Sequence, residues 1–147
     1  MSGLAGITNS GALPTLELSM RFAAQRQRLL AHNIANLTTP EFQPMDADPR
    51  DFQRALADAV QRRRDETGGQ RGPLPWREEG PLRRDARGDL RIDPDSPKHA
   101  VLRHDRNSSD LERSMQALAE NAAFFRLSSD LMRFESDRLV RAMRETV

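Results

Sequence analysis

SDLERSMQALAENAAFFRLSSDLMRFESDRLVRAMRETV, residues 109–147, carries a stripe of mostly apolar residues at alternating steps of four and three. The members of this C-terminal seam are Leu111, Met115, Leu118, Ala122, Phe125, Ser129, Met132, Ser136, Leu139 and Met143. Such a period keeps one face of a helix against a partner helix. Ser109 followed by Glu112 forms a capping box, which predicts where the helix begins. We therefore expect one long helix over residues 109–147.

A matching stripe lies near the N-terminus, in residues 13–37. The members of this N-terminal seam are Leu16, Met20, Ala23, Gln27, Leu30, Ile34 and Leu37. Pro14 suits the first turn of a helix, and Asn36 suits its end. Arg26 and the neighbouring Arg and Gln side chains are expected on the solvated side of this helix.

The two seams predict a mainly α fold, in which the long terminal helices pair as an antiparallel, coiled-coil-like hairpin. Gln27, Ser129 and Ser136 are polar members of the seams. A polar residue at such a position can fix the register of two helices. The equally weighted alternative is that these three residues lie at a solvated edge of the interface.

A short second helix is expected within residues 38–66. Asp48 can cap it, Pro49 occupies its first turn, and Gly68 and Gly69 end it. Apolar residues recur along one side of this segment, as a surface helix requires.

The remaining segments lack a regular period. Residues 1–12 read as a flexible lead, rich in small and polar residues. Residues 67–108 contain five prolines and few apolar residues, so we expect an irregular, loop-rich middle, either disordered or with one or two short strands. Residues 100–102 are the candidate strand.

Composition limits what the chain can do alone. Of its 147 residues 31% are charged and 37% are apolar, with a formal net charge of +1. The core should be slender and the isolated monomer marginal, so the seams are expected to need copies or partners. The absence of cysteine excludes disulfides. Neither a membrane-spanning run nor a cleaved signal peptide is expected.

The sequence predicts no enzyme, cofactor, metal site or small-molecule substrate. His32, His99 and His104 lack any ligand spacing, and no phosphate loop or nucleophile motif occurs. Acidic residues are interleaved with the arginines at 62–64, which favours a solvated loop over a nucleic-acid site. Trp76 is predicted either to anchor a partner or to pack on its own chain.

Two segments resemble motifs of the bacterial flagellar rod and hook axial proteins. Residues 24–43, AQRQRLLAHNIANLTTPEFQ, resemble the N-terminal signature LA-x-NIAN-x-TTP-x-F of this family. Residues 105–112, DRNSSDLE, with 118–121, LAEN, resemble the C-terminal motif DGN-x-VDLE followed by LAEN. The resemblance covers both ends of the chain and leaves the middle without a match.

Three positions depart from the family pattern. Glu41 stands where glycine with a positive φ is usual, and we expect a type I turn, which tolerates glutamate. Arg106 replaces a glycine and Ser109 replaces a valine. These changes concern loops and leave the predicted helices in place.

The resemblance implies a structural subunit that flagellar type III export carries out of the cytoplasm unfolded, without a cleaved signal peptide. It implies a place at the proximal end of the periplasmic rod of the basal body. The implied partners are other copies of the chain, other rod proteins, and components of the basal-body ring and export gate.

The implied subunit interface comprises the apolar members of both seams, Gln27, and four residues of the signature: Asn33, Asn36, Pro40 and Phe42. The amides of Asn33 and Asn36 are one helical turn apart and are predicted to reach backbone groups of an adjacent subunit. Plain capping by Asn36 is the alternative. A helical adaptor or a type III secretion chaperone is the alternative function, and a DNA-binding module is a distant third.

Overall fold

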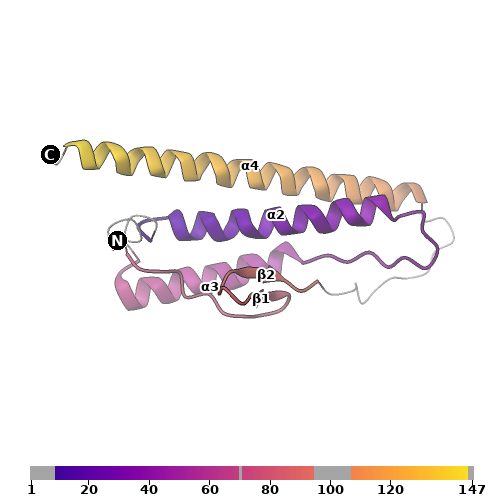
Figure 1. The fold of residues 1–147 in the computed structure, drawn as a ribbon, viewed down its shortest axis with the longest axis horizontal. Helices are drawn as coiled ribbons and strands as arrows, with labels where there is room; N and C mark the ends of the chain where they lie inside the picture. The colour runs from indigo at the N-terminus through magenta and orange to yellow at the C-terminus, as the bar shows by residue number, and fades with distance from the viewer. Residues whose placement is uncertain (1–8, 70, 95–106, 146–147) are drawn as a thin grey trace.

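The structure, a computed structural model, describes residues 9–69, 71–94 and 107–145. Its described elements are α2 (Leu13–Ala35), α3 (Pro49–Thr67), β1 (Leu82–Arg84), β2 (Leu90–Ile92) and α4 (Asn107–Glu145). Figure 1 shows α2 in the middle, with α4 along one side and α3 with the two strands on the other. The mainly helical prediction is confirmed, and the two long helices pack against each other.

Local sequence explains where α2 and α3 begin and end. Pro14 lies in the first turn of α2, and Asn36 is its C-terminal cap. The Asp48 carboxylate accepts a hydrogen bond from the Arg50 N–H at 2.8 Å, which caps α3. Gly68, with φ of 72°, ends α3 in the left-handed conformation. These predicted boundaries are confirmed.

The α4 helix begins earlier than the capping box predicts. It starts at Asn107, so Ser109 lies inside the first turn and the predicted start is wrong by two residues. Helix ends are commonly shifted by this amount, because backbone hydrogen bonding extends past a capping signal.

The segment before α4 is more ordered than its composition suggests. β1 and β2 form an antiparallel hairpin in which Leu82 pairs with Ile92. The Asp85 carboxylate accepts hydrogen bonds from the N–H groups of Asp89 and Arg87, and these bonds lower the pKa of Asp85. The expected alternative of one or two short strands is therefore confirmed for residues 71–94, and the alternative of disorder is wrong there. The candidate strand at 100–102 lies outside the described residues.

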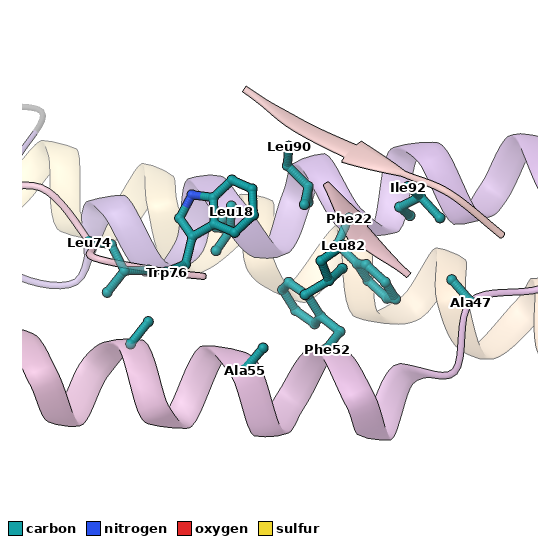
Figure 2. Packing of buried hydrophobic residues seen from close by; sticks show 11 residues of the cluster. Leu18, Phe22, Ala47, Phe52, Ala55, Leu74, Trp76, Leu82, Leu90 and Ile92 are labelled. Carbon is teal, nitrogen blue, oxygen red and sulfur yellow. The ribbon is translucent and has the colours of Figure 1, made fainter. Parts of the chain in front are cut away.

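The core lies between α2, α3 and the hairpin, away from most of the predicted seam (Figure 2). The rings of Phe22 and Phe52 stack with centroids 4.1 Å apart, and both residues are 1% exposed. Leu82 packs in the same cluster, and Trp76 packs on its own chain beneath the guanidinium of Arg84. The hairpin thus supplies apolar surface that the terminal helices alone do not have.

Candidate assembly interface

The signature TTP-x-F forms a tight turn at the end of α2. The Phe42 N–H donates to the Thr39 carbonyl at 3.2 Å, with Pro40 second and Glu41 third in the turn. Glu41 has a φ of 59° and is the one non-glycine residue with positive φ in the described part of the chain. A positive φ at the third position is typical of a type II turn, so the predicted type I turn is wrong.

The strain at Glu41 leads to a stability prediction. A left-handed conformation is unfavourable for any residue with a Cβ, and Glu41 is exposed. Glu41→Gly should therefore raise the free energy of unfolding by about 0.5–1 kcal/mol in urea titrations, after allowing for the greater entropy of unfolded glycine. Glu41→Ala is the control and should give no such gain. Equal stability of the two variants would contradict the strained turn.

After the turn, the chain is held back against α2 by two polar side chains. The Asn33 amide donates to the Met45 carbonyl at 2.7 Å and accepts from the Met45 N–H at 3.1 Å. The Arg26 guanidinium binds both carboxylate oxygens of Asp46, at 2.9 and 2.7 Å. We call these contacts the return clamp, because they fix the path from α2 to α3.

The return clamp corrects one prediction and reassigns another. Arg26 is 8% exposed, so its placement on the solvated side is wrong; its charge is buried because Asp46 neutralises it. Asn33 is 4% exposed and its amide is engaged within the chain. Asn36 caps α2 and donates to the His32 carbonyl at 2.8 Å, as the capping alternative predicted. A contact of either amide with a neighbouring subunit stays a prediction.

Loss of the Asn33 amide should destabilise the fold. Asn33→Ala leaves the Met45 N–H and carbonyl without partners, at an expected cost of about 1–3 kcal/mol in the free energy of unfolding. Asn36→Ala, which removes a more exposed amide from the same turn, should cost less. Chemical denaturation of both variants measures the difference, and a larger loss in Asn36→Ala would argue against the clamp.

Two further side chains, both on α2, dock the hairpin onto this helix. The Gln25 amide donates to the Leu90 carbonyl at 2.5 Å and accepts from the Ile92 N–H at 2.8 Å. Arg21 lies between Glu17 and Asp89, at 2.8 and 2.5 Å, and its hydrogen bond to Glu17 is the main cause of its raised pKa.

Arg63 fastens the segment before α2 to the end of α3. It is buried and donates to the carbonyls of Gly11 and Asn9 at 2.7 and 2.8 Å. The solvated-loop interpretation of residues 62–64 is therefore wrong for Arg63. The sequence pattern gave no signal for this role, because the carbonyls of Gly11 and Asn9 lie more than 50 residues away along the chain.

Contact between the two long helices centres on Asn121, the last residue of the LAEN motif. Its amide donates to the Ala23 carbonyl and to the Gln27 side-chain oxygen, both at 2.8 Å. Asn121 is 3% exposed, so a helix shifted by one residue would leave this amide without partners. Gln27 has a defined partner, which favours the register-fixing alternative over a wet edge.

The N-terminal seam lies partly in this contact. Ala23 and Leu30 are buried. The other members, Leu16, Met20, Gln27, Ile34 and Leu37, are half-buried. Pro40 is exposed, and Phe42 is half-buried with its ring edge-on to His32 at 5.6 Å.

The C-terminal seam is rotated away from α2. The most protected line of α4 instead has a seven-residue period, through Ser114, Asn121, Ser128 and Glu135. Seam members Leu118, Ser129, Met132, Ser136 and Leu139 are half-buried beside this line, and Leu111, Met115, Ala122, Phe125 and Met143 are exposed. The buried Asn121 amide explains the rotation, because its two hydrogen bonds set which face of α4 meets α2. The expectation that the whole seam faces the partner helix within the chain is therefore wrong.

Every large hydrophobic residue that is exposed in the described chain lies on α4. These residues are Leu111, Met115, Phe125, Leu127, Leu131, Phe134, Val140 and Met143, exposed by 38–63%. Their summed exposed surface is on the order of 700 Å², all of it on one helix. Among the described elements, α2 is the one that Figure 1 shows alongside α4, and no described element covers these eight side chains.

No group of three His, Asp or Glu side chains among the described residues is placed to hold a metal ion. His32 packs on Phe42, whereas His99 and His104 lie outside the described residues. None of the described helices is long and apolar enough to cross a membrane.

Comparisons with known proteins return nothing: no family profile, curated protein or solved structure matches the chain significantly.

Proposed function

We propose that the chain is a structural subunit of the bacterial flagellar basal-body rod, placed at its proximal end, as a protein of the FlgB type. In this role it polymerises through its terminal helices into the shaft that transmits motor rotation. It carries out no reaction and needs no cofactor.

The observation that carries this proposal is the exposed apolar surface of α4. All the large exposed hydrophobic residues of the described chain lie on one helix, and exposed apolar surface of this kind is typical of a face that other molecules cover. A rod subunit has such a face, because its neighbours in the rod cover the helix.

The family motifs support the same proposal, because residues of both motifs make hydrogen bonds that hold the fold together. Asn33 belongs to the N-terminal signature and holds the chain after the turn, and Asn121 belongs to the LAEN motif and joins α4 to α2. Glu41 keeps the positive φ that the family usually assigns to glycine.

In the proposed subunit, α2 and α4 form an antiparallel, coiled-coil-like hairpin. The start of α2 and the C-terminal end of α4 lie toward the same end of the molecule, which suits an antiparallel pair (Figure 1). The seven-residue period of the protected line on α4 suits coiled-coil packing.

The proposed partners are other copies of the chain, other rod proteins, and components of the basal-body ring and export gate. The proposed location is the periplasmic rod, reached through the flagellar export apparatus.

Basal bodies purified from the source bacterium test the proposal. An epitope-tagged chain should co-purify with the rod after detergent extraction, and deletion of the gene should give non-motile cells whose basal bodies lack a rod. Motile cells after the deletion, or a chain found only in the cytoplasm, would contradict it.

A type III secretion chaperone is the second candidate, because an exposed apolar helix also suits binding to an unfolded export substrate. Sedimentation and circular dichroism of the purified chain separate the two functions. A chaperone should be a stable helical dimer at micromolar concentration, whereas a rod subunit should be monomeric there.

A further inference from the structure

The exposed hydrophobic residues of α4 fall into two groups on opposite flanks of the helix. Row A comprises Leu111, Met115, Phe125, Val140 and Met143. Row B comprises Leu127, Leu131 and Phe134. At 3.6 residues per turn, the two rows lie on either side of the line through Asn121 and Ser128 that faces α2. One neighbouring helix cannot cover both rows.

Symmetry limits how copies of this chain can cover these rows. In a two-fold pair the same patch is used by both copies, so one row would be buried twice and the other would stay exposed. In a head-to-tail contact, row A of one copy meets row B of the next, and both rows are buried in every interior copy. Only the second arrangement accounts for two exposed rows on one helix with one kind of contact.

We propose that row A of one copy of this chain packs against row B of the next copy, so that α4 helices associate side by side in a continuing series. The proposal deepens the proposed function, on which it rests, by naming the two surfaces through which the subunits polymerise.

Charges along α4 are complementary in this arrangement. Arg126 and Arg133 lie along the outer edge of row A, and Asp130 and Asp137 lie on the outward ridge that borders row B. All four residues are exposed and form no ion pair among the described residues. Because each pair is separated by seven residues, one axial offset places both arginines opposite both aspartates of the neighbouring copy.

The available area suits a polymer better than an isolated pair. Row A exposes on the order of 400 Å² and row B on the order of 300 Å² of side chain. Together these apolar areas are well below the roughly 1,200 Å² of total surface that stable specific pairs bury. Each contact should therefore be weak alone, and the series should grow only at high local concentration or on an existing rod.

Two variants that each lose one row test the proposal. Phe125→Glu disrupts row A, Phe134→Glu disrupts row B, and Ala57→Glu, the matched control, changes an exposed residue of α3, away from both rows. At several hundred micromolar, the parent chain and Ala57→Glu should form oligomers larger than dimers in sedimentation velocity. Each row variant alone should stay monomeric. An equimolar mixture of the two should form dimers and nothing larger, because one intact row remains on each chain.

Circular dichroism should show equal helix content in all the variants, and Met115→Glu replaces Phe125→Glu if the latter is less helical. A mixture that stays monomeric, a row variant that dimerises alone, or a parent chain without oligomers overturns the row pairing. Recovery of the parent chain in purified rods tests the proposed function separately. Its outcome does not depend on which rows of α4 pack together.

Discussion

Replacing Phe22 with alanine is expected to lower the free energy of unfolding by about 3–5 kcal/mol, a large part of the 5–15 kcal/mol that stabilises a typical domain. Phe22 is 1% exposed and stacks on Phe52 where α2, α3 and the hairpin meet (Figure 2). The variant therefore loses a buried ring and leaves a cavity beside a second ring. Urea titration followed by circular dichroism measures the change.

Phe125→Ala is the matched control for Phe22→Ala, because it removes the same ring from a helix. Phe125 is 38% exposed on α4 and should contribute far less to the stability of the isolated chain. If the two substitutions were equally destabilising, the core would include the C-terminal seam, and its assignment to α2, α3 and the hairpin would be wrong.

Deleting residues 111–147 is expected to abolish incorporation into the rod and to leave cells non-motile. The deletion removes both exposed rows and the Asn121 contact with α2, whereas the buried core cluster lies entirely within residues 18–92. Export should continue, because signals of this export route are expected near the N-terminus. Immunoblots of the culture supernatant and of purified basal bodies measure the two outcomes.

Ala57→Glu, a full-length chain with one exposed substitution on α3, controls for expression in the same experiment. It should be both exported and incorporated. Normal motility of cells that carry only the truncated chain would refute the role of α4 in assembly.

Local signals in the sequence were sufficient to predict the helices. Asp48, Pro49 and Gly68 fix the ends of α3 by backbone hydrogen bonding and allowed φ values, which depend on adjacent residues only. The same holds for Pro14 and Asn36 in α2.

The core and the polar contacts could not be predicted in this way, because they depend on residues far apart in the chain. Leu82, Leu90 and Ile92 are isolated apolar residues among charges, and they become a core only when the hairpin folds onto α2. Gln25 and Arg26 look solvated on a helical pattern, yet the hairpin and Asp46 supply their partners.

The proposed assembly surface coincides only in part with the seam predicted from the sequence. The heptad seam of α4 identified Leu111, Met115 and Phe125 as interface residues, and the structure leaves them exposed. Row B was missed, because Leu127 and Phe134 fall outside the heptad positions and their exposure depends on how Asn121 rotates α4 against α2.

A density map of the intact basal body is the most direct test of the central claim that this chain is a rod subunit assembled through α4. The map should show α2 and α4 of successive copies in the wall of the proximal rod, with Phe125 of one copy near Phe134 of the next. A rod wall built entirely from other proteins, with this chain absent, would contradict the claim.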